Sequence, residues 1–172
     1  PDLIIETGIA HGGGLVFYAS MLELIGGDGQ VLGIEQHIFP EIRDEIEHHR
    51  MFRRITMLEG NSVSRSIIEK VSEIAHGKKR VLVALDSNHT HEHVLAELEL
   101  YSPLVTKGSY LVVFDTMVNE VDESHYANRP WGADNNPGTA VKAFLAKNSR
   151  FEVDESVSSK LQISSCQGGY LK

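Results

Sequence analysis

Short runs of apolar, mostly branched residues alternate along the chain with longer segments of helical spacing. The apolar runs are Leu3–Ile5, Val31–Ile34, Ile55–Leu58, Val81–Leu85 and Tyr110–Phe114. This alternation is typical of βαβ units, in which consecutive strands run parallel. The last two runs are apolar throughout, as expected of strands covered by helices on both sides. The pattern therefore predicts an α/β fold with an open, mostly parallel sheet and helices on both faces.

Two of the intervening segments present an apolar helical face. Its positions are Val63, Ile67, Val71 and Ile74 in the segment after Asn61, and Val94, Leu95, Leu98 and Tyr101 in the segment after His89. Gly77 ends the first helix and Pro103 the second. We expect a further helix over Gly138–Lys147 and two more strands near Phe151–Val153 and Leu161–Ser164.

The segment Thr116–Pro137 breaks the pattern, because it is rich in turn-forming residues and lacks periodicity. Loops of more than about 12–15 residues are uncommon in compact domains and usually have a function or are disordered. This one carries Trp131, Arg129 and Asn136, which we expect to close over a bound substrate. The alternative that Trp131 serves only packing stays open.

Size and composition point to a single domain spanning residues 1–172, with 41% hydrophobic residues for its core. No apolar run reaches the roughly 18 residues of a membrane span. The formal charge of −8 argues against a nucleic-acid partner.

The single Cys166 excludes an intramolecular disulfide and fits a reducing compartment, so we expect a cytoplasmic protein. The chain opens on Pro1 directly before an apolar run, and we expect an N-terminal segment to be lacking. Assembly as a homo-oligomer stays open.

A glycine cluster, “ETGIAHGGG”, lies between the first predicted strand and the first predicted helix. Ligands of open parallel sheets bind at the carboxyl ends of the strands, and a helix N-terminus there offers free N–H groups. Glu35 ends the second strand, where a carboxylate can bind two ribose hydroxyls. The loop and Glu35 together therefore predict a nucleotide-type cofactor site.

The loop departs from the dinucleotide fingerprint G-x-G-x-x-G. It reads E-x-G-x-A-x-G across Glu6, Gly8, Ala10 and Gly12. The acidic residue ahead of the glycines suits a cationic ligand better than a pyrophosphate. Two alternatives stay open, namely that the glycines only serve helix packing and that Glu6 only caps the following backbone.

Asp86 and Asp115 end the fourth and fifth predicted strands, so both carboxylates should emerge at the edge that carries the glycine loop. Carboxylate oxygens suit a hard cation such as Mg²⁺, which leaves positions for substrate oxygens. The alternative that these aspartates cap helices or bind water carries similar weight.

Several histidines lie near these carboxylates. His89 or His91 is a candidate general base. His89, His93 and Asp86 also match the residue types of a two-histidine, one-carboxylate iron site, which we disfavour because it leaves the glycine loop unexplained. His11, inside the loop, is a candidate contact of the cofactor or substrate.

The segments “ETGIAHGGGLVFYASML”, “GQVLGIE”, “LDSNHTHEHV” and “RPWGADNNP” resemble the S-adenosylmethionine-dependent methyltransferases of the cephalosporin hydroxylase and rhamnosyl O-methyltransferase family. The resemblance implies a Rossmann-like fold of the class I methyltransferase type, with an antiparallel last strand. It implies methyl transfer from S-adenosylmethionine to a hydroxyl of a sugar or another small polar metabolite. Glu6 would lie near the aminoacid end of the cofactor, Glu35 would bind ribose, and Gly8, Ala10, His11, Gly12, Gly13 and Asp86 would line it.

By the same resemblance, Asp86 and Asp115 would hold a divalent metal such as Mg²⁺, and Asp86 would join His89 and His91 in catalysis. Phe114 stands where the cephalosporin member has an acidic side chain, which implies weak metal binding or none. Two other functions stay open. One is an NAD(P)-dependent oxidoreductase on the same fold, and the other is a non-catalytic cofactor-binding domain.

Overall fold

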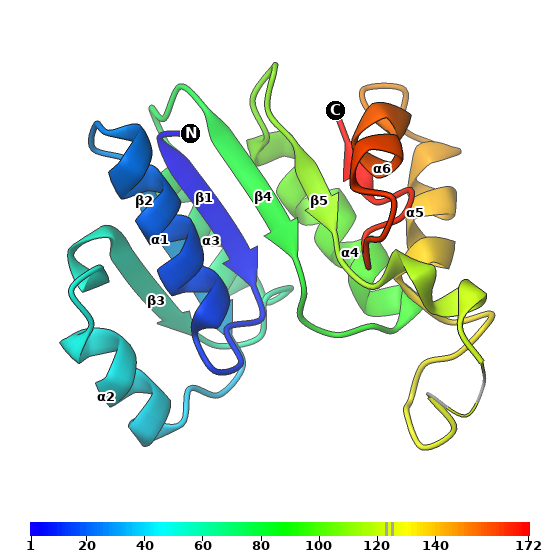
Figure 1. Cartoon of the computed structure of the whole chain (residues 1–172), viewed down its shortest axis with the longest axis horizontal. Coiled ribbons are helices and arrows are strands. Elements are labelled where there is room, and N and C mark those ends of the chain that lie inside the picture. Colours follow the sequence, from blue (N-terminus) through cyan, green and yellow to red (C-terminus); the bar gives the residue numbers. More distant parts are fainter. Residues whose placement is uncertain (123, 125) are drawn as a thin grey trace.

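The computed structural model describes residues 1–122, 124 and 126–172. Its centre is a six-stranded sheet with the order β3-β2-β1-β4-β5-β6 (Figure 1). The strands are β1 (Leu3–Thr7), β2 (Gln30–Glu35), β3 (Ile55–Glu59), β4 (Val81–Leu85), β5 (Leu111–Val113) and β6 (Tyr170–Leu171). Neighbouring strands from β3 to β5 are parallel, and β6 is antiparallel to β5. The open, mostly parallel sheet and its antiparallel last strand are confirmed.

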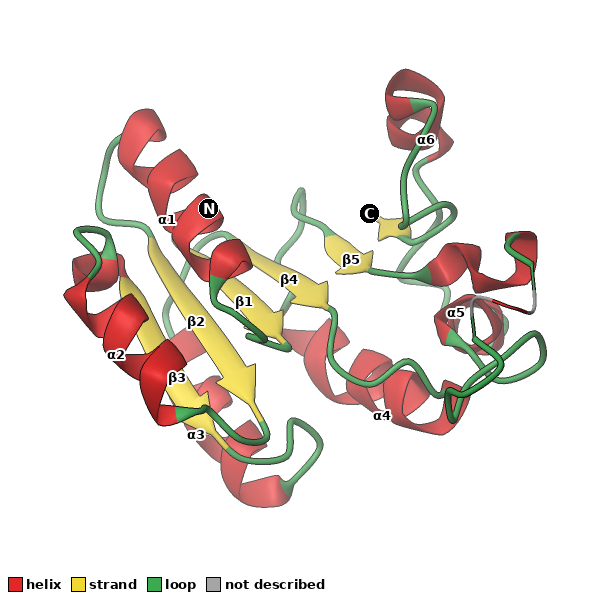
Figure 2. Ribbon diagram, turned by 60° about the horizontal axis from the view of Figure 1, so that its bottom comes forward, coloured by secondary structure: helices red, strands yellow, loops and turns green. Residues whose placement is uncertain are grey.

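Helices cover both faces of the sheet, as predicted (Figure 2). They are α1 (Gly13–Ile25), α2 (Pro40–His48), α3 (Arg65–Ala75), α4 (His91–Tyr101), α5 (Pro137–Leu145) and α6 (Glu155–Leu161), with 3₁₀ turns at η1 (Phe52–Arg54), η2 (Ser102–Leu104) and η3 (Thr116–Glu120). Within the described residues, no helix combines the length and apolar character needed to cross a membrane.

Two hydrophobic clusters lie on opposite faces of the sheet because side chains alternate along each strand. In β1, Ile4 packs with Leu15 and Ala19 of α1. Its neighbours Leu3 and Ile5 belong to the other cluster, together with residues of α3, α4 and α5. All five residues of β1 are buried, which explains why this strand reads as a continuous apolar run up to Glu6.

The end of the chain differs from the sequence-based expectation. Leu161–Ser164 is not a strand, because α6 ends at Leu161 and the last strand is Tyr170–Leu171. Asp154 starts α6 by accepting hydrogen bonds from the backbone N and the Oγ of Ser156. In the run Phe151–Val153, only Val153 forms a bridge, to Leu171. The helix that begins at this cap therefore includes Leu161, the first residue of the predicted strand, and residues 162–164 are irregular.

The predicted long loop begins with η3 and ends at α5, whose start carries a capping box. The Asn136 side chain accepts from the Thr139 N–H, and the Thr139 hydroxyl lies 3.2 Å from the Asn136 N. Residues 123 and 125 of this loop lie outside the described part of the chain.

The carboxyl ends of β1 and β4 form the switch point of the sheet. β1 lies between β2 and β4, and the chain leaves β1 toward α1 but leaves β4 toward α4, on the opposite face (Figure 2). The loop after β1 nevertheless stays close to β4, because Gly8 (φ 91°) passes directly over the Asp86 carbonyl. A Cβ at Gly8 would lie 2.0 Å from the Asp86 O. Ligands of open sheets bind at such a switch point.

We predict that Gly8→Ala destabilises the fold more than the matched change Gly108→Ala. Both glycines have positive φ, but a Cβ at Gly108 meets open space. Gly108→Ala should cost about 1–2 kcal/mol for its left-handed backbone, and Gly8→Ala about 1–3 kcal/mol more for the overlap with Asp86. Urea denaturation measures both free energies of unfolding. Equal costs would show that the loop does not depend on this close approach.

Candidate functional site

Two hollows border the loop at Gly8. The larger has a volume of about 540 Å³, and its walls include Glu6, Ala10, Asp86 and Phe114. The smaller has a volume of about 200 Å³ and is lined mainly by residues at or just after the carboxyl ends of β2, β3 and β4, together with Gly8 and His93. Gly8 borders both hollows. An elongated ligand that lies across Gly8 can therefore occupy both.

Glu35, at the end of β2, borders the smaller hollow and also holds the glycine loop in place. Its Oε2 accepts hydrogen bonds from the N–H groups of Ile9 (3.0 Å) and Ala10 (3.2 Å), and its Oε1 accepts from Gln36 N at 2.8 Å. A carboxylate can accept about four hydrogen bonds, so capacity remains for a ligand hydroxyl. The predicted ribose contact stays a prediction, and the structure adds the anchoring of the loop.

Glu6 is 5% exposed, and its Oε2 lacks a hydrogen-bond partner among the described residues. Its carboxyl group lies so close to the start of α1 that a Cβ at Gly14 would be 2.3 Å from Oε1. Burial, and to a lesser degree the charge of Asp86, raise the pKa of Glu6 to about 8. Glu6 is therefore mostly protonated at pH 7, and a cation in the larger hollow would favour its ionised form.

The remaining loop residues divide into two groups. Ala10, His11 and Gly13 line the larger hollow, and their contact with a cofactor stays a prediction. Gly12 lines neither of the two hollows, and a Cβ there would lie 2.5 Å from Cδ1 of Ile46 in α2. The structure thus gives Gly12 a packing role between the loop and α2.

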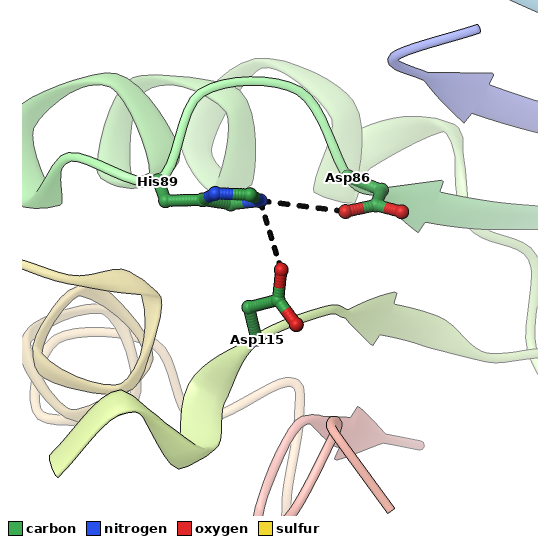
Figure 3. A group of neighbouring side chains, drawn as sticks. All are labelled: Asp86, His89 and Asp115. Atoms are coloured by element: carbon green, nitrogen blue, oxygen red, sulfur yellow. Dashed lines mark hydrogen bonds and ion pairs between the residues drawn. The ribbon is translucent and has the colours of Figure 1, made fainter. Parts of the chain in front are cut away.

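Asp86, His89 and Asp115 converge beside the larger hollow (Figure 3). Asp86 follows β4, His89 comes from the loop before α4, and Asp115 follows β5. The Nε2 atom of His89 lies 3.4 Å from Oδ1 of Asp86 and 3.1 Å from Oδ2 of Asp115. The predicted pairing of the two aspartates at one edge of the sheet is therefore present, with an imidazole between them.

The charges in this cluster influence one another. The hydrogen bond to Asp86, supported by the charge of Asp115, raises the pKa of His89 above its usual value. Burial raises the pKa of Asp115, and the nearby Asp86 adds to this effect. The indole of Trp131 meets the His89 ring edge-on, with 5.4 Å between the ring centroids. Trp131 therefore packs at the predicted site, against one of its candidate catalytic residues.

His91 and His93 point elsewhere. The Nδ1 atom of His91 lies 2.8 Å from the Thr139 hydroxyl at the start of α5. The Nε2 atom of His93 lies 3.0 Å from the Ser62 hydroxyl, beside the smaller hollow. The disfavoured iron site does not form, since in the described part of the chain the cluster of metal-binding groups is Asp86, His89 and Asp115.

The smaller hollow contains residues that the sequence analysis did not single out. They are Gln36, Gly60, Asn61, Ser62, Ser87 and Asn88. Each follows the carboxyl end of a predicted strand, so the rule that found Glu35 could have found them.

Comparison with known proteins places the chain in a family. The family model described as “Rhamnosyl O-methyltransferase/CmcI” matches residues 1–172. A rhamnosyl O-methyltransferase of Mycobacterium tuberculosis (strain H37Rv) is 32% identical over 123 residues, which are 69% of this chain and 47% of that protein. The corresponding protein of Mycobacterium leprae is 32% identical over 69% of this chain and 50% of its own length. The chain thus spans about half the length of these curated relatives.

Solved structures share the fold at low sequence identity. A CmcI structure with Mg and SAM has a TM-score of 0.63 at 19% identity, covering 100% of this chain and 64% of that chain. MycE methyltransferase in complex with Mg and SAH has a TM-score of 0.58 at 16% identity, covering 83% and 35%. A short-chain dehydrogenase/reductase of Veillonella parvula in complex with NADP has a TM-score of 0.52 at 15% identity, covering 88% and 66%. The match over the whole sequence is decisive: the chain belongs to the rhamnosyl O-methyltransferase/CmcI family.

Proposed function

We propose that this chain carries the catalytic domain of an S-adenosylmethionine-dependent O-methyltransferase that acts on a hydroxyl of a sugar or another small polar metabolite. The observation that carries the proposal is the pair of hollows that meet at Gly8. One offers Glu35 to a ribose, and the other offers the unpartnered, buried Glu6 to a cationic group. The family match and the relatives named rhamnosyl O-methyltransferase support it. The buried, unpaired Cys166 is compatible with the expected cytoplasmic setting.

The residues at this edge of the sheet would have different roles in the reaction. S-adenosylmethionine would supply the methyl group, transferred in line from its sulfonium to the acceptor oxygen. Glu35 would hold the nucleoside end and Glu6 the aminoacid end, which leaves the reacting centre near Asp86. His89 would take the proton of the acceptor hydroxyl at Nε2, and Asp86 and Asp115 would stabilise the resulting imidazolium. The structure favours His89 over His91 as the base, since His91 faces Thr139.

The donor set of this cluster also fits a divalent cation. One ligand atom each from Asp86, His89 and Asp115 lie within 4.8 Å of one another. Carboxylate oxygens are ligands that Mg²⁺ accepts, so Asp86 and Asp115 would hold it, whereas Phe114 adds no donor. When bound there, the cation would lower the pKa of an acceptor hydroxyl. Neighbours solved with Mg support this assignment.

An NAD(P)-dependent oxidoreductase is the second candidate, because a dehydrogenase with NADP shares the fold. The loop argues against it, since Ala10 stands where the dinucleotide fingerprint has a glycine. A non-catalytic domain would bind the cofactor without turnover.

We predict that the purified chain binds S-adenosylhomocysteine in a calorimetric titration and does not bind NADPH. Glu35→Ala should weaken binding by about 1.5–3 kcal/mol, the range for losing hydrogen bonds to a charged group. The matched control is Glu59→Ala at the same edge of the sheet, where Glu59 pairs with Glu35 in register and forms an ion pair with Arg43. Affinity for NADPH alone would contradict the proposal, and equal affinities of the two variants would remove Glu35 from the ribose role.

Cofactor binding at pH 7 should release close to one proton. The pKa of Glu6 is raised to about 8, so the free protein holds this proton, and a ligand ammonium group nearby would lower the pKa and expel it. Titration in buffers of different ionisation enthalpy measures the number of protons. The release should shrink as the pH rises through 8 and should fall in Glu6→Gln. An unchanged proton count in this variant would show that Glu6 does not sense the ligand charge.

Millimolar Mg²⁺ should raise the melting temperature of the chain. At tenfold excess over the dissociation constant, the gain is about 1.4 kcal/mol, or roughly 3–6 °C for a chain of this size. The double variant Asp86→Asn, Asp115→Asn should lose this response, whereas Asp134→Asn, an exposed aspartate of the long loop, should keep it. If Mg²⁺ has no thermal effect and turnover persists in EDTA, the metal assignment fails and proton removal rests on His89 alone.

A further inference from the structure

We propose that Glu97 makes the smaller hollow select an aminopurine over an oxopurine, by fixing the direction of a hydrogen bond in its wall. The inference rests on the proposed function, in which this hollow holds the nucleoside end of the cofactor. Glu97 itself does not line the hollow; it acts through Ser87, which does. It is therefore a positioning residue.

Glu97 is an unusual residue for its place in the fold. It lies on the buried face of α4 beside Val94 and Leu98, and it is 0% exposed. A buried carboxyl group costs free energy unless it is hydrogen-bonded. Its Oε1 accepts a hydrogen bond from the Ser87 hydroxyl at 2.7 Å and lies 3.5 Å from Nε2 of His93, whereas Oε2 lacks a partner within the described residues. All the polar contacts of Glu97 thus face the wall of the smaller hollow.

The hydrogen bond to Glu97 determines what Ser87 can offer a ligand. A serine hydroxyl has one proton to donate and two lone pairs that accept. Because Ser87 donates its proton to Glu97, its oxygen can only accept on the side of the hollow. Ser62, which also lines this hollow, is held as well, because Tyr101 donates to the Ser62 carbonyl at 2.8 Å and the Ser62 hydroxyl lies 3.0 Å from His93 Nε2.

An obligate acceptor distinguishes purines by their exocyclic group. The amino group of adenine donates a hydrogen bond, whereas the oxo group of hypoxanthine only accepts. An oxo group facing the Ser87 hydroxyl oxygen would leave two acceptors opposite each other without a proton between them. A site built around one hydrogen-bond polarity rejects an analogue of the opposite polarity because a buried polar group is left unpaired.

The test compares S-adenosylhomocysteine with S-inosylhomocysteine, its 6-oxo analogue, in calorimetric titrations of the purified chain. The wild type should prefer the amino form by roughly 10- to 100-fold, as expected for one unpaired polar group in a partly open site. In Glu97→Gln, the side-chain amide can donate to Ser87 and free its hydroxyl to donate into the hollow. The preference should then fall below about threefold, mainly through tighter binding of the oxo form, which a general loss of structure would not produce.

Two further variants complete the design. Ser87→Ala should lose the preference by losing the acceptor, and it keeps the inference testable if Glu97→Gln does not fold. Glu99→Gln, an exposed glutamate on the same helix, should retain the wild-type preference. Equal binding of the two ligands by the wild type, or an unchanged preference in both Glu97→Gln and Ser87→Ala, overturns the inference while leaving the methyltransferase assignment intact. Failure of the wild type to bind S-adenosylhomocysteine removes both.

Discussion

The close approach of the β1–α1 loop to the end of β4 is the contact on which the site depends. Gly8 passes over the Asp86 carbonyl at a distance that excludes any side chain. Because of this approach, Glu6 before the loop and Asp86 beneath it border one hollow, while Ser87 borders the other.

Negative charge concentrates around this contact. Glu6, Glu35, Asp86 and Asp115 meet at one edge of the sheet, and the imidazole of His89 lies between Asp86 and Asp115. Protonation of Glu6 reduces the repulsion between these carboxylates, because burial and the charge of Asp86 raise the pKa of Glu6 to about 8. An environment of this kind favours ligands that bring positive charge, such as a sulfonium, an ammonium group or a metal ion.

Much of this arrangement could be predicted from the sequence. The apolar periodicities of strands and helices indicate the fold, and the rule that ligands bind at the carboxyl ends of parallel strands indicates the site. The apolar runs located the first five strands, and the carboxyl-edge rule brought Glu35, Asp86 and Asp115 to one side of the sheet. Contacts made through tertiary packing could not be predicted. The His91 side chain contacts Thr139, which lies 48 positions further along the chain. Gly12 lies close to Ile46, which lies 34 positions further along. Leu161, the first residue of a predicted strand, instead ends a helix that begins at the Asp154 cap, and the strand propensity of residues 161–164 did not indicate this.

The anchoring of the glycine loop by Glu35 has a consequence for the thermodynamics of binding. Ordering one residue of a flexible segment costs about 1–2 kcal/mol of conformational entropy. Two backbone N–H groups of this loop already donate to Glu35 before any ligand arrives, so that entropy is lost when the chain folds rather than when the ligand binds. More of the intrinsic interaction energy then appears as affinity, as in other preorganised sites. A carboxylate at the end of β2 thus transfers a cost of recognition to the folding of the domain.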